Sequence, residues 1–132
     1  MNAVSHAIAT KLNTEGVGVL GATSGWRIQA NREPTEPDDV LTVYDTGGSA
    51  PALFDEELRA PSIQIRTRSH DYDAAYGKQQ EAFAVLNAIV NETIEGFRYL
   101  GVWMTSDIIA IGRDENDRFL LTSNYQVERH ET

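Results

Sequence analysis

The sequence contains no cysteine, few basic residues and no long apolar run, and each absence excludes a class of protein. Without cysteine the chain can form no disulfide, no cysteine-ligated metal site and no thiol nucleophile. It has 11 Lys and Arg residues against 20 Asp and Glu residues, a net charge of −9, so we expect no sequence-specific binding of nucleic acid. No apolar stretch approaches the roughly 20 residues that cross a bilayer, and the first residues do not read as a secretory signal, so we expect no membrane contact.

The length and composition are those of one soluble globular unit. A chain of 132 residues has the usual size of a domain, and a hydrophobic content of 41% is sufficient for one core. No internal repeat or low-complexity segment divides it. We therefore predict a single domain over residues 1–132.

Two segments show the spacing of amphipathic helices. The first runs from the start of the chain to Asn13 or Gly16. Its apolar stripe comprises Val4, Ala7, Ile8 and Leu12. The second follows His70, where Asp71 or Asp73 can accept hydrogen bonds from free N-terminal amides. Its apolar side comprises Ala75, Gln79, Ala82, Phe83, Leu86, Ile89 and Val90.

Other segments have the pattern of strands. Residues 62–69 (SIQIRTRS) alternate apolar or small residues with polar ones, which is typical of a strand with one buried face. Residues 40–44 are rich in β-formers and precede Gly47 and Gly48, so they predict a strand that runs into a turn.

The last third of the chain predicts a closing hairpin. Apolar runs at 99–104 and 108–111 precede an acidic turn at 114–117, and residues 119–128 then alternate again. The order of helix, strands, helix and strands predicts an α+β fold, with an antiparallel or mixed sheet and two helices packed on one face.

One catalytic alternative comes from residues 45–47 (DTG). Aspartic proteases of the retroviral type place this tripeptide at the end of a strand, so that two carboxylates meet across a dimer and share a proton. Residues 112–114 (GRD) are similar to a later stretch of those enzymes. Against this, Gly48 stands where that family prefers a small hydroxyl or methyl side chain, and a helix occupies the region expected to form an all-β flap. We keep a protease acting through Asp45 as a remote alternative.

The remaining polar motifs favour structural roles. Gly16, Gly18 and Gly21 spell GxGxxG, but the pattern follows a helix and no clear helix opens after it, which is the wrong context for a dinucleotide site. His70 and the two aspartates after it are typical of a helix start. The acidic turn lacks the glycine and distal glutamate of a calcium loop. We predict no catalytic centre, no metal site and no cofactor.

Four arginines have two interpretations. Arg66 and Arg68 project from one face of their strand, and Arg113 and Arg118 lie near the final turn. In a chain this acidic, they can pair with carboxylates of a neighbouring subunit. Equally, they can lie on an exposed sheet face and form weak, scattered ion pairs. The sequence alone leaves both alternatives open.

Three stretches together resemble the minor capsid and tail terminator proteins of tailed bacteriophages. They are YDTGGSAP at 44–51, SIQIRTRSHDYDAAY at 62–76 and IGRDENDRFLLTSNYQVER at 111–129. The resemblance covers residues 40 to 129 and gives the motifs in the order that this family has them. It identifies the single domain as a tail-terminator-like one.

The resemblance implies a structural virion protein and not an enzyme. Its subunits would form a ring, commonly a hexamer, that caps the tail tube, stops tube polymerisation and provides the surface for joining the head. The implied partners are further copies of the chain, the tail tube protein and the head-tail connector or neck protein. The implied location is the head-proximal end of the virion tail, after assembly in the cytoplasm of the host bacterium. A head-completion or neck protein is the alternative within this interpretation.

The resemblance also carries over a set of motif residues. The candidates for subunit or partner contacts are Tyr44, Thr46, Gly47, Gly48, Arg66, Arg68, Asp71, Tyr72, Arg113, Asp114, Arg118 and Asn124. Ser69, Gly112 and Tyr125 complete the motifs. We also expect the loop at 47–52 (GGSAPA) and the acidic linker at 33–39 (EPTEPDD) to become ordered on assembly.

Overall fold

The structure is a computed structural model that describes residues 3–49 and 57–131. Within these residues, two helices and seven strands follow one another. They are α1 (Val4–Thr14), β1 (Val19–Leu20), β2 (Arg27–Ala30), β3 (Val40–Ser49), β4 (Leu58–Ser69), α2 (Tyr72–Asn87), β5 (Val90–Ile94), β6 (Phe97–Arg113) and β7 (Phe119–His130).

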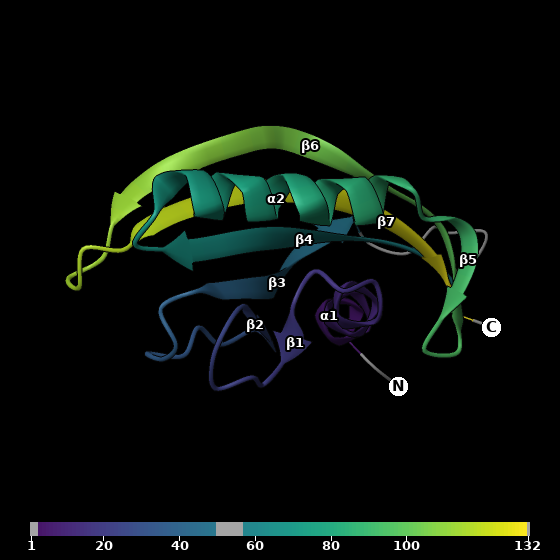
Figure 1. Ribbon diagram of the computed structural model, residues 1–132. Coiled ribbons are helices and arrows are strands. Elements are labelled where there is room, and N and C mark those ends of the chain that lie inside the picture. The colour runs from purple at the N-terminus through teal and green to yellow at the C-terminus, as the bar shows by residue number, and fades with distance from the viewer. Residues whose placement is uncertain (1–2, 50–56, 132) are drawn as a thin grey trace.

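All seven strands belong to one sheet in the order β1-β2-β3-β4-β7-β6-β5. The pairs β1–β2 and β2–β3 are parallel, and every other neighbouring pair is antiparallel. The long strand β6 arches over α2, while α1 lies beside β1 and β3 at the other end of the sheet (Figure 1). The seven strands together form a curled sheet with the shape of a half-barrel.

The predicted layering, with two helices packed on one face of a sheet, is wrong, although the broad α+β class fits. Strands make up 51% of the described residues, and the two helices contact different strands: α1 mainly β1–β3, and α2 mainly β4, β6 and β7. The physical reason is the pairing of β6 with β7, whose register shifts at four places. Such bulges bend a strand and increase its twist, so the sheet curls. They also interrupt the alternation along β6, which is why the sequence shows two short apolar runs there.

The helices themselves are confirmed. In α1 the predicted stripe is buried, and in α2 the N-cap is Asp71, whose side chain accepts a hydrogen bond from the N–H of Asp73. The predicted apolar side of α2 is wrong at its edge, because Phe83 is exposed and Val90 lies in β5 and is exposed. Neither α1 nor α2 is long and apolar enough to cross a membrane.

The alternation predicted for residues 62–69 is confirmed over most of β4. Ile63, Ile65 and Thr67 are fully buried and point toward the hydrophobic core, which defines the core face of the sheet. Gln64 and Arg66 are half-buried and project from the opposite face, called here the outer face. The closing hairpin is confirmed as β6 and β7, which are joined by the acidic turn.

Candidate interaction surface

The outer face of the sheet brings together motif residues that are far apart in the sequence. The strand register places Tyr44 of β3 opposite Gln64 of β4, and Gln64 opposite Asn124 of β7. Two residues further along β4, Arg66 lies between Thr42 of β3 and Thr122 of β7. Because side chains alternate between the faces of a strand, these residues share one face. The predicted candidates on three strands therefore belong to a common surface.

Hydrogen bonds link this outer face from strand to strand. The side chain of Gln64 donates to Oδ1 of Asn124 at 3.3 Å, and Nδ2 of Asn124 donates to Oγ of Ser106 on β6 at 2.8 Å. The hydroxyls of Thr46 and Ser62 lie 2.8 Å apart across β3 and β4. Each bond between neutral groups contributes little by itself, about 1 kcal/mol. Together they orient polar side chains across four strands.

Arg68 is the most buried of the candidate arginines, with an exposed fraction of 2%. Its guanidinium donates to three main-chain carbonyl oxygens of the linker: Pro37 at 2.7 Å, Thr35 at 3.3 Å and Asp38 at 3.3 Å. The linker at 33–39 carries two prolines, which have no N–H and do not continue a strand ladder, so its carbonyl groups need other donors. Arg68 supplies them and holds the linker against β4.

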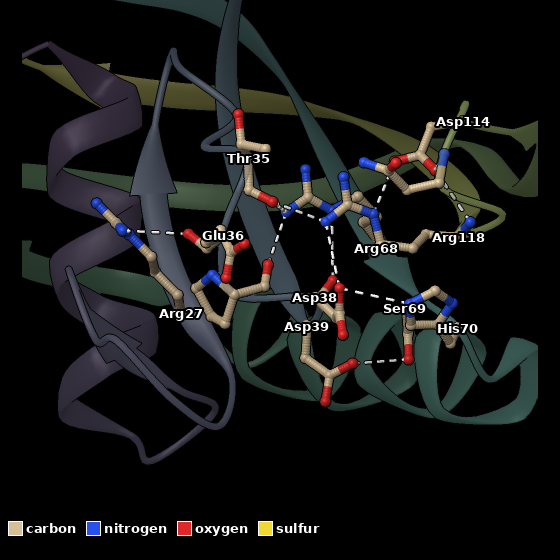
Figure 2. Close-up of polar contacts among 12 residues, drawn as sticks. Arg27, Thr35, Glu36, Asp38, Asp39, Arg68, Ser69, His70, Asp114 and Arg118 are labelled. Atoms are coloured by element: carbon tan, nitrogen blue, oxygen red, sulfur yellow. Dashed lines mark hydrogen bonds and ion pairs between the residues drawn. The ribbon is translucent and has the colours of Figure 1, made fainter.

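Arg118 holds the same linker from the other side. Its guanidinium donates to the Thr35 carbonyl oxygen at 2.7 Å and to Oδ2 of Asp114 at 2.8 Å, and it lies 3.4 Å from Oδ1 of Asp38. Figure 2 shows Arg68 and Arg118 side by side, both directed at this part of the linker. The two side chains and residues 33–39 are called here the arginine–linker cluster. It connects β4, the linker and the turn between β6 and β7.

Opposing electrostatic effects act on this cluster. Burial lowers the pKa of the Arg68 guanidinium and the charge of Arg118 lowers it further, while Glu33, Asp114 and Asp38 act in the opposite direction. An arginine remains protonated at any ordinary pH, so two adjacent cations persist here. They are tolerated because their N–H groups donate to carbonyl and carboxylate oxygens.

The acidic turn is braced by the same arginine. Burial acts to raise the pKa of the Asp114 carboxyl, but hydrogen bonds from the backbone and side chain of Arg118 and from the N–H of Asn116 outweigh it, and this pKa lies below its ordinary value. The carboxylate of Asp114 thus accepts three N–H donors within its own turn. Asp114 has a structural role in the subunit.

For Arg68 and Arg118, the interpretation as an exposed sheet face with weak ion pairs is wrong, because both side chains are buried. Contact of these residues with a neighbouring subunit stays a prediction. Arg66 also pairs within the chain, with Nε 3.0 Å from Oε2 of Glu33. Arg113 is exposed and pairs with Asp117 at 2.9 Å. The sequence gives no sign of the carbonyl partners of Arg68 and Arg118, since a main-chain carbonyl has no signature in a sequence.

The structure gives the linker hydrogen-bond partners within one subunit, and the expectation that it becomes ordered on assembly stays a prediction. The hydrogen bonds of Arg68 and Arg118 give residues 33–39 a defined place within one subunit. Half of the second predicted segment, residues 50–52 of 47–52, lies outside the described residues, because the description of β3 stops at Ser49. Whether that segment contacts a partner stays a prediction.

A second group of candidates lies at the N-terminal end of α2. The ring of Tyr72 meets the ring of Phe119 edge-on, with centroids 5.5 Å apart, and stacks with Tyr76 at 6.3 Å. The guanidinium of Arg113 lies 5.5 Å from the centre of the Phe119 ring. Asp71 caps the same helix end. These residues are separate from Tyr44, Gln64 and Asn124, the neighbouring polar residues on the outer face.

Gly47 and Gly48 are explained by backbone geometry. Both have positive φ angles, 95° and 103°, which a residue with a side chain rarely adopts. A Cβ atom on Gly48 would also collide with the backbone of Ala60 and Pro61 in β4. Close pairing of β3 with β4 therefore requires glycine at this position.

Asp45, the residue on which the protease alternative depends, has a structural role in the subunit. Its carboxylate accepts hydrogen bonds from the N–H of Ser5 at 3.0 Å, from the Ser5 hydroxyl at 2.6 Å and from the Asn31 amide at 3.0 Å. The N-cap of α1 is Ala3, which has no side-chain acceptor. Asp45 of β3 therefore caps α1 from a distant part of the chain.

Replacing Asp45 with Asn is expected to lower the free energy of unfolding by about 1 kcal/mol. The amide loses the negative charge that favours a helix N-terminus and replaces one accepting oxygen with a donor facing Ser5 and Asn31. Urea unfolding measures the loss. Asp117→Asn is the matched control, since Asp117 is exposed and pairs only with Arg113 on the surface. An equal effect of the two changes would contradict the capping role.

An apolar groove lies between α2 and β6, and no motif in the sequence predicts it. Its volume is about 180 Å³. It is lined by Tyr76, Gln80, Phe83, Met104, Asp107 and Ile108. Spacing alone assigned Phe83 to the core. The signal for an exposed role was the aromatic pair Tyr76 and Phe83, which recurs at the heptad distance of one helix face. Within residues 3–49 and 57–131, no cluster of three or more His, Asp or Glu residues could hold a metal ion.

Comparison with solved structures finds the same fold in a chain of a virion particle. The chain superposes with a TM-score of 0.71 on a chain of the structure titled "Virion of native gene transfer agent (GTA) particle", over 97% of this chain and 95% of that one. The two sequences are only 11% identical, so this likeness shows the fold alone. A comparison with curated proteins gives no significant match.

The sequence profile of the family described as "Bacteriophage tail terminator protein" matches residues 11–130. The chain therefore belongs to the bacteriophage tail terminator family. The resemblance seen in its motifs is confirmed, and the protein is a structural tail protein and a virion component.

Proposed function

We propose that this chain is the tail terminator subunit itself: a single domain that forms a ring, a hexamer, on the head-proximal end of the tail. The ring caps the tail tube, stops its polymerisation and offers the surface to which the head connector or neck protein binds. The observation that carries the proposal is the family match, which spans nearly the whole chain.

The architecture suits such a role because buried hydrogen bonds connect the segments in which the resemblance motifs lie. The arginine–linker cluster fixes the linker to β4 and to the β6–β7 turn, and Gly48 permits the close pairing of β3 with β4. A ring needs subunits of constant shape, since an error at each contact accumulates around the circle. Capping requires only binding, so the proposal assigns the protein no catalytic role. Assembly takes place in the host cytoplasm and the product resides in the virion.

The test is the length of tails formed without this protein. Particles produced in its absence are expected to carry overlong tails in negative-stain images, and purified protein added during assembly should restore uniform tails. Tails of normal length beside heads that lose their DNA would instead indicate the neck role and overturn the proposal.

The same assay separates a structural role from the protease alternative. At a temperature at which Asp45→Asn is folded, the variant should restore tail length as well as Asp117→Asn does. A folded Asp45→Asn protein that fails while the control succeeds would favour the enzyme.

A further inference from the structure

We propose that the free edge of β6, from Val102 to Arg113, binds the free edge of β3 on a second copy of this chain, so that one continuous sheet passes from subunit to subunit. This inference rests on the proposed ring and names the contact that closes it. The partner is a second copy because the chain itself carries both complementary edges.

The first observation is the length of the unpaired edge on β6. This strand pairs with β7 along its whole course, but β5 pairs only with its first part, from Phe97 to Gly101. Beyond Gly101, no strand among the described residues lies on the other side of β6. In Figure 1 this part of β6 forms the uncovered upper arch of the sheet. Its outward N–H and C=O groups can therefore pair with another strand.

The second observation is the chemistry of that edge. Natural sheets protect long edges with lysine, proline, inward-pointing charges or bulges. The edge of β6 has bulges, with three register shifts beyond Gly101, but little charge. Between Val102 and Arg113 there is no lysine and no proline, and the charged residues are Asp107 and Arg113 at the end of the edge. Ile109 and Ile111 are large apolar residues with exposed fractions of 53% and 51%. An edge that leaves such side chains in water is typical of a surface that becomes covered.

The third observation is a groove that runs beside the same edge. Met104, Asp107 and Ile108 of β6 form one wall, and Tyr76 and Phe83 of α2 belong to the other. The side chains of an added strand point alternately to the two faces of the sheet. One set can enter this groove while the other covers Ile109 on the outer face.

The complementary edge is on β3. The strand β2 pairs with β3 only from Val40 to Val43, and the side chain of Asn31 accepts the next outward N–H, that of Asp45. Residues 46–49 are exposed and uncharged, and no described strand lies on their outer side. In a chain with a net charge of −9, two nearly uncharged edges are the places where copies approach with least repulsion.

The use of two different edges determines the kind of assembly. A contact between the β6 edge of one copy and the β3 edge of the next is heterologous, and repetition of such a contact closes a ring when the rotation fits. A contact between two β6 edges would be self-complementary and would stop at a dimer. Heterologous pairing is therefore the form that agrees with a terminator ring.

The experiment blocks each edge separately. Ile109→Lys combined with Ile111→Lys places two charges on the β6 edge, and Thr46→Lys places one on the β3 edge. All three positions are exposed, so folding should persist, which circular dichroism checks. Val19→Lys is the matched control, because Val19 is 58% exposed and lies on β1, outside the proposed contact. Assembly is measured by light scattering and negative-stain images, alone and with tail tubes.

We expect rings from the unchanged chain and from Val19→Lys, and only monomers from either blocked variant. A mixture of the two blocked variants should give a heterodimer of twice the monomer mass, since each variant retains one intact edge. Rings formed by the Ile109→Lys, Ile111→Lys variant would overturn this inference and leave the proposed function intact. Dimers of Thr46→Lys alone would show β6–β6 pairing and would also overturn it. If the unchanged chain forms no ring even on tail tubes, the proposed function fails together with the inference.

Discussion

Replacing Arg68 with Met should lower the free energy of unfolding by about 3 kcal/mol, because the change breaks a buried network of hydrogen bonds to a charged group. Methionine fills part of the space but donates nothing, so the carbonyl groups of Thr35, Pro37 and Asp38 lose a donor together. Glu33 also loses a cationic neighbour, whose Nη1 lies 3.6 Å from its Oε1. Urea unfolding followed by circular dichroism measures the loss.

The matched control for this change is Arg113→Met. Arg113 is exposed and forms a surface pair with Asp117, and such pairs contribute less than about 1 kcal/mol. Amide hydrogen exchange gives a second readout, since residues 33–39 should exchange faster in Arg68→Met and unchanged in Arg113→Met. Equal destabilisation by the two changes would show that the linker does not depend on Arg68.

Features that depend on neighbouring residues were predictable from the sequence. The buried face of β4, the stripe of α1 and the cap at Asp71 follow from side-chain periods and from the chemistry of a helix terminus. The family resemblance was predictable for another reason, because it depends on the order of motifs and not on how they fold.

Features that depend on distant partners were not predictable. Arg68 and the carbonyl groups it binds are about 30 positions apart, and any residue type offers the same carbonyl oxygen. The curl of the sheet depends on bulges in β6, which a sequence with a weak period does not locate. The layering was predicted incorrectly for this reason, since ordinary strand patterns are compatible with a flat sheet or a curled one.

The motif residues and the proposed contact residues overlap only in part. Arg68 and Arg118, which belong to the motif stretches, hold the subunit in shape through hydrogen bonds to the linker. Thr46, Gly47 and Gly48 of the proposed β3 edge lie in the first motif stretch, and Ile111 opens the third. Ile109 is exposed and lies outside all three stretches, so the motifs alone do not delimit the proposed contact.

Replacing Gln79 with Met should also lower the free energy of unfolding by about 3 kcal/mol. Gln79 is completely buried in α2, and its amide donates to the carbonyl oxygens of Ile65 and Leu121 at 3.0 Å each. Its Oε1 accepts the hydroxyl of Ser123 at 2.6 Å. Methionine has a similar length and fills the space, so the loss measures the unsatisfied polar groups in β4 and β7 and not a cavity. Thermal and urea unfolding provide the measurement.

The neighbouring residue supplies the control, because Gln80 is exposed and Gln80→Met should change the stability by less than about 0.5 kcal/mol. Adding Ser123→Ala distinguishes a lost hydrogen bond from general disruption. In the unchanged chain Ser123→Ala removes a donor from Gln79, whereas in Gln79→Met it removes a hydroxyl that already lacks its partner. The second substitution should therefore cost about 1 kcal/mol less in the Gln79→Met background. Strictly additive losses would show that Gln79 and Ser123 act independently and would contradict an energetic role for the hydrogen bond between them.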